Sequence, residues 1–237
     1  MAHIVASFDA ELQKLSTLVV DMGATVGRQI EDAAEAFRTR NLELAKKVVA
    51  TDKTVDALQM RIEERVIAMI AKRQPLAIDL RETIATLKIA TDLERMGDLA
   101  KNNAKRVIAM NDQTQPTGAG VNLDILSKRA FEQLSRVMQA YVRRDTKLAR
   151  GVWDSDSEID TLHTALFREL LTYMMEDPRS IGYCTHLLFC AKNLERFGDH
   201  ATNIAENIHY VATGEFLSGD RPKGPNPSSI RSDTQEQ

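Results

Sequence analysis

Residues that cross-link or interrupt a chain are scarce in this sequence. Its 237 residues include two cysteines, six prolines and one tryptophan, and aromatic side chains make up 5%. Cys184 and Cys190 lie six residues apart, a spacing that matches no zinc motif and suits a disulfide along one helix poorly. We interpret them as buried thiols of a reducing compartment. The sequence therefore excludes a disulfide framework and a cysteine-rich structural zinc site.

Long hydrophobic runs and an excess of one charge are also missing. No apolar stretch approaches the roughly 18 to 20 residues that span a bilayer, and the N-terminus has neither the basic start nor the apolar run of a signal peptide. These features predict a cytoplasmic protein that meets membranes only through its partners. The 31 basic and 34 acidic residues occur in mixed order, so we expect no nucleic-acid surface.

Catalytic motifs are missing as well. The chain has no Gly-rich phosphate loop and no Ser-His-Asp or Cys-His order of residues, so we do not expect an enzyme. The sequence shows no basic or Gly-rich pocket, so we expect no appreciable affinity for free phosphate in the absence of a metal ion.

Helix-forming residues fill most of the chain. Ala, Leu, Glu, Lys, Arg and Met dominate between residues 4 and 212, and the apolar positions recur at helical spacing. Pro75, Pro116 and Pro178 stand in short polar stretches, where proline ends one helix or starts the next. The pattern predicts six helices, at about 4–38, 41–73, 76–110, 122–143, 145–176 and 179–212.

One heptapeptide occurs twice. The sequence Asp/Asn-Leu-Glu-Arg-Met/Phe-Gly-Asp stands at 92–98 and at 193–199, and the segments before the two copies also align. Gly97 and Gly198 are costly in a helix interior and predict the close approach of another helix or a ligand. The duplication predicts an all-α fold of two tandem three-helix bundles with long antiparallel helices. We expect the first bundle at 1–111, a linker at 112–121, the second bundle at 122–213 and a disordered tail at 214–237.

Each repeat carries acidic residues four positions apart on two of its helices, and residues at this spacing share a helix face. If consecutive helices fold back at the proline breaks, a rise of about 1.5 Å per residue brings the two pairs of a repeat to the same level. Converging carboxylates repel one another, so the sequence predicts that they bind cations. The predicted metal ligands are Asp52, Asp56, Glu94 and Asp98 in the first repeat and Asp156, Asp160, Glu195 and Asp199 in the second.

The type of ligand limits the type of metal. Oxygen-only ligation favours hard ions such as Mg²⁺, Mn²⁺, Ca²⁺ or ferric iron, and carboxylates alone can also hold zinc. A single acidic pair on a helix is usually no more than a solvated face. The duplication and the matched levels favour metal binding for the set.

Several neighbouring residues leave their roles open. Arg95 and Arg196 can orient a ligand, contact phosphate or pair with a nearby acid. His163 follows the acidic pair of its helix, and His209 completes a Glu-x-x-His spacing that is typical of di-iron bundles. That spacing occurs in one repeat only, which makes it weak evidence for a ligand.

Over residues 4 to 214 the chain resembles the PhoU family of phosphate-signalling proteins. The resemblance rests on both heptapeptides, on Asn102-Asn103 after the first, on His200-Ala201 and Asn203-Ile204-Ala205-Glu206 after the second, and on the Asp-x-x-x-Asp of each second helix. It implies two similar three-helix bundles, a multinuclear metal cluster at each pairing of motifs, and a homodimer. The first heptapeptide begins with Asp92 and the second with Asn193, a difference that would make the two metal sites unequal.

The resemblance also implies a function. Proteins like this report high phosphate by linking the ATPase subunit of an ABC-type phosphate importer to a sensor histidine kinase, which keeps phosphate-starvation genes off. The chain would then be a negative regulator that binds iron, manganese, magnesium or zinc. The residues alone leave two alternatives: a carboxylate-bridged metalloenzyme or metal-storage bundle, and a structural scaffold that retains no metal.

Overall fold

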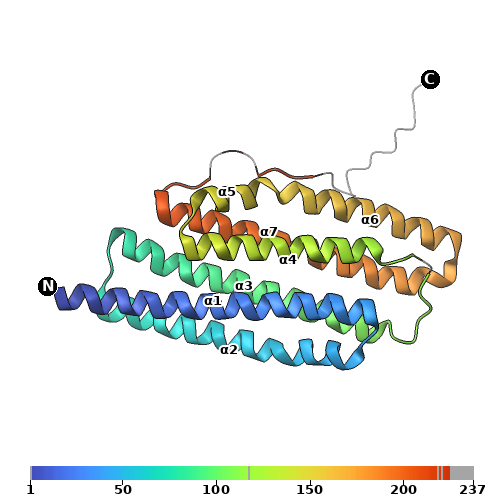
Figure 1. Ribbon diagram of the computed structural model, residues 1–237, viewed down its shortest axis with the longest axis horizontal. Helices are drawn as coiled ribbons and strands as arrows, with labels where there is room; N and C mark the ends of the chain where they lie inside the picture. Colours follow the sequence, from blue (N-terminus) through green and yellow to red (C-terminus); the bar gives the residue numbers. More distant parts are fainter. Residues whose placement is uncertain (1, 117, 218, 220, 225–237) are drawn as a thin grey trace, which may run out of the picture.

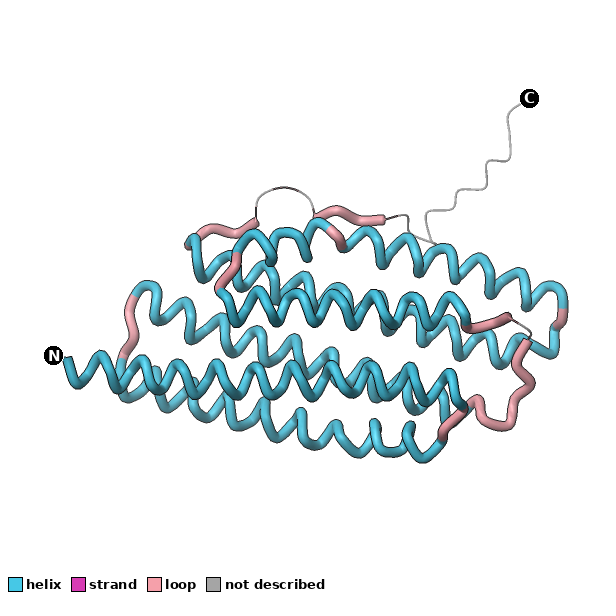
Figure 2. The backbone as a smooth tube through the Cα atoms, in the orientation of Figure 1, coloured by secondary structure: helices cyan, strands magenta, loops and turns pink. Residues whose placement is uncertain are grey.

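The computed structural model describes residues 2–116, 118–217, 219 and 221–224, and the described part of the chain contains helices but no strand (Figures 1 and 2). The elements are α1 (Ala2–Thr39), α2 (Leu42–Arg73), α3 (Ala77–Ala109), α4 (Val121–Arg143), α5 (Thr146–Asp154), α6 (Asp156–Glu176), the 3₁₀ turn η1 (Pro178–Ser180) and α7 (Ile181–Thr213). The predicted all-α fold is confirmed, and five of the six predicted helices match to within a few residues.

The two repeats lie side by side and are offset along the long axis of the molecule. Figure 1 shows α1, α2 and α3 in one half of the molecule and α4 to α7 in the other, with the long helices nearly parallel or antiparallel. Helix α3 packs along α7 as extensively as along α2, and α1 also packs on α4. One apolar core runs through both repeats and includes the equivalent residues Leu93 and Leu194.

The duplication extends to the connections between helices. Arg40 and Arg144 occupy equivalent positions, and both have left-handed backbone, with φ of 51° and 52°. The next residue caps the following helix in both repeats: Asn41 accepts a hydrogen bond from the amide of Leu44, and Asp145 accepts two from the first turn of α5. These sites are the breaks that separate the first helix of each repeat from the second.

The predicted helix at 145–176 is wrong in one respect, because it is interrupted at Ser155. Its counterpart in the first repeat, Thr51, lies inside the continuous helix α2 and donates its hydroxyl to the carbonyl of Lys47, four residues back. The hydroxyl of Ser155 instead donates to the carbonyl of Val152, three residues back, and the backbone at Ser155 has φ −87° and ψ 4°. Short polar side chains compete in this way with regular helix hydrogen bonds, so the segment forms α5 and α6.

The glycine of each heptapeptide lies where a neighbouring helix approaches closely. A Cβ atom at Gly97 would lie 3.2 Å from Oε1 of Gln29, and one at Gly198 would lie 2.9 Å from Cδ1 of Ile159 and 3.0 Å from Oε1 of Gln133. The prediction of a close helix approach is therefore confirmed. The contact is tighter in the second repeat.

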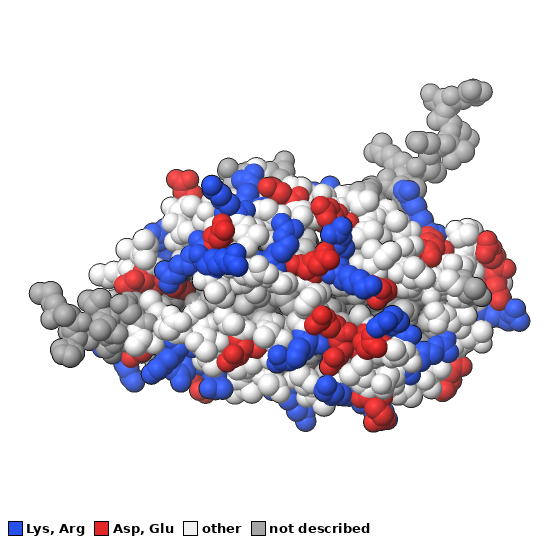
Figure 3. Space-filling view, viewed as in Figure 1, with Lys and Arg blue, Asp and Glu red and all other residues white. Residues whose placement is uncertain are grey.

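The surface mixes charges of both signs, as Figure 3 shows for one face. Among the described residues, no helix combines the length and the apolar character that a membrane span needs. Part of the predicted tail, residues 218, 220 and 225–237, lies outside the described residues. The described residues 221–224 contact the second repeat in a way that the sequence analysis did not anticipate.

We predict that Gly198→Ala destabilises the protein more than Gly97→Ala. Alanine gains about 1 kcal/mol of helix propensity over glycine. That gain roughly offsets the milder contact at position 97, whereas overpacking at position 198 costs about 1–3 kcal/mol. Urea denaturation of both variants measures the difference. Equal unfolding free energies would contradict the unequal packing.

Candidate metal centre

The first acidic group lies where α2 and α3 run side by side. Asp52 and Asp56 come from α2, and Glu94 and Asp98 come from α3. The side-chain nitrogen of Lys101, also on α3, lies 2.5 Å from a carboxylate oxygen of Asp52 and 2.5 Å from one of Asp98. One ammonium group thus bridges the two helices, which confirms that the acidic pairs of this repeat meet at the same level.

The side chains of the first acidic group act on one another. Burial and the charge of Asp98 raise the pKa of Glu94, and burial and the charge of Asp52 raise the pKa of Asp56. Burial disfavours the charge on Lys101, but its hydrogen bonds to Asp52 and Asp98 outweigh burial and raise its pKa. Lys101 therefore stays charged at neutral pH and offsets part of the repulsion.

The second acidic group lies between α6 and α7. Asp156 and Asp160 come from α6, and Glu195 and Asp199 come from α7. The guanidinium of Arg221 forms a bidentate pair with Asp156, at 2.7 and 2.8 Å, and its Nη2 lies 2.6 Å from Oδ1 of Asp199. A single cation again joins the two helices, so the level match holds in this repeat too.

The two repeats take their bridging cation from different places. Thr202 stands where the first repeat has Lys101, and its hydroxyl donates to Oδ1 of Asp156 at 3.0 Å. The positive charge comes instead from Arg221, which follows α7 along the chain. Burial raises the pKa of Asp199 and outweighs the opposing effect of the positive charge on Arg221. Arg221 was not predicted as the bridging cation, although the alignment of the repeats already places Thr202 opposite Lys101.

A buried glutamine from the first helix of each repeat lies against the motif glycine. Gln29 and Gln133 hold equivalent positions and are 1% and 5% exposed. Neither amide atom of Gln29 has a hydrogen-bond partner among the described residues, and the same holds for Oε1 of Gln133. A buried unpaired polar atom costs about 1–3 kcal/mol, so this pattern favours a bound polar species close to the acidic groups. Sequence reasoning missed both glutamines.

The all-oxygen donor set fits a hard cation, on condition that the bridging Lys101 or Arg221 is displaced. Among the described residues, no three acidic, histidine or cysteine side chains already surround a common point as metal ligands. The bridging cation of the chain itself stands between the carboxylates. A metal ion would take the place of Lys101 or Arg221 and accept oxygen ligands from both helices. The assignment of the eight carboxylates as metal ligands stays a prediction.

The arginine and histidine candidates lie around these groups. The side chain of Arg95 is 59% exposed and lies 3.5 Å from Glu94, so it pairs with a neighbouring acid. Arg196 is exposed. His163 is buried, and burial lowers its pKa.

The Glu-x-x-His spacing has a structural partner. Glu206 accepts a hydrogen bond of 3.0 Å from the indole nitrogen of Trp153, which ties α7 to α5. Nδ1 of His209 is buried without a hydrogen-bond partner among the described residues. The contact to Trp153 explains Glu206 without a metal.

Asp92 lies in the contact between the two repeats. It is hydrogen-bonded to Nδ1 of His200 at 2.8 Å and accepts a hydrogen bond from Asn203 at 3.3 Å. The equivalent Asn193 donates to Asn103 at 2.8 Å. The departure between the two heptapeptides therefore affects how α3 meets α7, and its effect on the metal sites stays a prediction.

These features define a class of protein: an internally duplicated helical bundle with an acidic group on one hairpin of each repeat. Comparison with known families agrees with this description. The model of the PhoU domain matches residues 19–107 and 123–208, and the chain belongs to the PhoU family. The resemblance inferred from the heptapeptides is confirmed.

Curated relatives and solved structures support this assignment. A phosphate-specific transport system accessory protein PhoU homolog from Rhizobium meliloti is 48% identical, over 98% of this chain and 98% of its own. The Escherichia coli accessory protein PhoU is 37% identical, over 90% and 88%. The crystal structure of PhoU from Pseudomonas aeruginosa has a TM-score of 0.85 at 34% identity and covers 88% of this chain and 100% of its own. The phosphate transport system regulatory protein PhoU from Streptococcus pneumoniae has a TM-score of 0.82 at 28% identity, with 89% and 99% covered.

We predict that Glu94→Gln stabilises the metal-free protein. The substitution removes one charge from the first acidic group, and relief of a partly exposed like-charge contact is worth roughly 0.5 kcal/mol, or about 1–2 °C in Tm. Thermal unfolding in the presence of chelator measures the shift. Glu64→Gln, on an exposed face of α2, is the matched control and should leave Tm unchanged. A lower Tm for Glu94→Gln would contradict net repulsion in the group.

Proposed function

We propose that this protein is a negative regulator of the phosphate-starvation response. It couples an ABC-type phosphate importer to a sensor histidine kinase in the cytoplasm and acts through docking. The observation that carries the proposal is family membership, together with relatives named as accessory to a phosphate-specific transport system. The S. pneumoniae structure is described as a regulatory protein, which supports regulation over catalysis.

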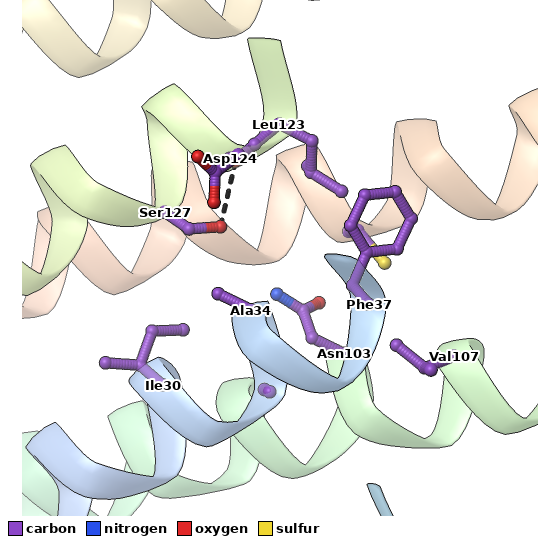
Figure 4. A pocket seen from close by; sticks show the side chains of 10 residues that line it. Ile30, Ala34, Phe37, Asn103, Val107, Leu123, Asp124 and Ser127 are labelled. Carbon is purple, nitrogen blue, oxygen red and sulfur yellow. Dashed lines mark hydrogen bonds between the residues drawn. The ribbon is translucent and has the colours of Figure 1, made fainter. Parts of the chain in front are cut away.

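Not every pocket of the molecule is a candidate phosphate site. Figure 4 shows one between α1, α3 and α4, where Ile30, Phe37, Val107 and Leu123 supply apolar walls. Asp124 lies at its edge, and Ser127 donates its hydroxyl to the backbone within α4. None of the ten residues drawn is basic, so the pocket lacks the donors that recognise phosphate. We therefore place no phosphate site in this pocket.

Docking needs accessible helical faces, and α2 offers one. Met60 and Ile67 lie seven residues apart on the same face of α2 and are 60% and 66% exposed. Exposed apolar side chains at this spacing suit contact with another protein, either a second copy of this chain in a homodimer or the importer ATPase and the kinase. The membrane is reached only through such partners.

The metal forms part of this proposal. Carboxylates from α2 and α3, and from α6 and α7, meet in pairs at one level, and their all-oxygen donor set suits iron, manganese, magnesium or zinc. Bound metal would hold the two helices of each hairpin together and offer open positions to a phosphate or to a partner oxygen.

The alternative function is a carboxylate-bridged metalloenzyme or a metal store. The same acidic groups favour it, because carboxylate-bridged helical bundles also house redox and hydrolytic metals. Incubation of metal-loaded protein with peroxide or a generic phosphate ester distinguishes an enzyme from a regulator. Turnover would favour the enzyme, and a large stoichiometry of bound iron would favour the store.

We predict that metal content depends on both acidic groups. The double variant Asp98→Asn/Asp199→Asn keeps side-chain shape but removes one charged ligand from each group, so elemental analysis after anaerobic purification should show a sharp fall in bound metal. Asp79→Asn, in the first turn of α3 and outside both acidic groups, is the control and should retain wild-type content. Unchanged metal content in the double variant would contradict metal binding by the acidic groups.

We predict that cells without this protein express phosphate-starvation genes even at high phosphate. A reporter for such a gene should be active in the deletion strain and silent after complementation with the wild-type chain. Complementation with Asp98→Asn/Asp199→Asn, at matched protein levels, tests whether the acidic groups are needed. Normal repression in the deletion strain would refute the regulatory function, whether or not the protein binds metal.

A further inference from the structure

The described part of the tail is fitted to the second acidic group at two points. Figure 1 shows it running back from the end of α7 over α5 and the start of α6. Arg221 bridges Asp156 and Asp199, as described above. Two residues after Pro222, the amide of Gly224 donates to Oδ2 of Asp160 at 2.9 Å. We call residues 221–224 the strap.

Gly224 lies against α6 with no space for a side chain. A Cβ atom there would come within 2.6 Å of Cβ of Asp160 and 2.9 Å of the carbonyl of Ser157. The backbone can approach α6 this closely only because the residue is glycine. The strap therefore meets the acidic group through a charged side chain and through a close backbone contact, which are independent features of the sequence.

The start of the tail is also anchored. The ring of Phe216 stacks on that of Tyr210 in the last turns of α7, with centroids 4.5 Å apart. This contact lies before the strap and involves none of the acidic residues. Release of the strap can thus occur while the chain stays attached at Phe216.

We propose that the strap is a built-in competitor for metal at the second acidic group, so that metal binding there and docking of residues 221–224 exclude each other. Arg221 occupies the space between Asp156 and Asp199 and takes up both oxygens of Asp156 in a bidentate pair. A cation that binds these carboxylates must displace the guanidinium. The inference rests on the proposed metal-binding role of this group.

Within the described part of the chain, the bridging cation of the first acidic group does not come from a separate segment. Its bridging cation, Lys101, belongs to the same helix as Asp98 and can swing aside on its own side chain. Arg221 lies 22 residues beyond Asp199, so its departure moves a separate segment of backbone. Metal at the second group therefore changes the surface over α5 and α6, whereas metal at the first group changes one side-chain conformation.

The test uses the full chain in a background that disables the first group, Asp52→Asn/Asp98→Asn, so that calorimetric titration with Mn²⁺ reports the second group. Arg221→Ala should bind Mn²⁺ about tenfold more tightly than the background, because no competitor has to leave. Lys223→Ala removes the same charge from an exposed position of the strap, where it acts on Asp199 more weakly than Arg221 does, so it should tighten binding less than Arg221→Ala. Gly224→Ala keeps Arg221 but cannot pack on α6, and should also tighten binding.

A second measurement follows the strap itself. Hydrogen exchange by mass spectrometry should show faster exchange across residues 221–224 when Mn²⁺ is added, because the amide of Gly224 loses its carboxylate partner. Equal Mn²⁺ affinities for Arg221→Ala and Lys223→Ala, or unchanged exchange in the strap at saturating Mn²⁺, would overturn the competition while leaving metal binding in place. Failure of every variant to bind Mn²⁺ would refute the metal-binding role and the competition together.

Discussion

Repulsion between carboxylates on facing helices is the constraint that shapes both repeats. Two acidic pairs at one level would cost on the order of 1–4 kcal/mol for each close contact without a nearby positive charge. Lys101 supplies that charge between α2 and α3, and Arg221 supplies it between α6 and α7. The helices can pack closely at this level because each repeat brings a cation to it, and a metal ion would meet the same need with a larger charge.

The helical fold could be predicted because its signals are local. Apolar spacing and proline breaks gave the long helices, and the repeated heptapeptide gave the duplication. The break at Ser155 was not predicted because Thr51 and Ser155 are both short hydroxyl residues, although Thr51 lies inside α2 and Ser155 lies between α5 and α6. The different acceptors of the two hydroxyls are visible only in the structure, so sequence spacing cannot show the break.

The acidic groups were also predictable, but the residues that complete them were not. A rise of 1.5 Å per residue places Asp52 level with Asp98 without knowledge of side chains. Gln29 and Gln133 come from the first helix of each repeat, α1 and α4. Spacing rules do not predict how such a helix is rotated about its axis relative to the other two. Arg221 comes from a segment whose glycine and proline content is typical of disorder, and its place against Asp156 depends on a contact distant in sequence.

Unequal bridging cations favour a regulatory protein over a store. A store gains from many equivalent sites, whereas a duplicated chain that keeps one cation on a helix and the other on a separate segment has two sites with different responses to the same ion. The contact between Asp92 and His200 joins α3 to α7, so the two repeats form one packed body in which a change at one hairpin can reach the other. A protein that docks on partners through its helical faces can use such a difference as a signal, because loading the second group alters the surface that a partner meets.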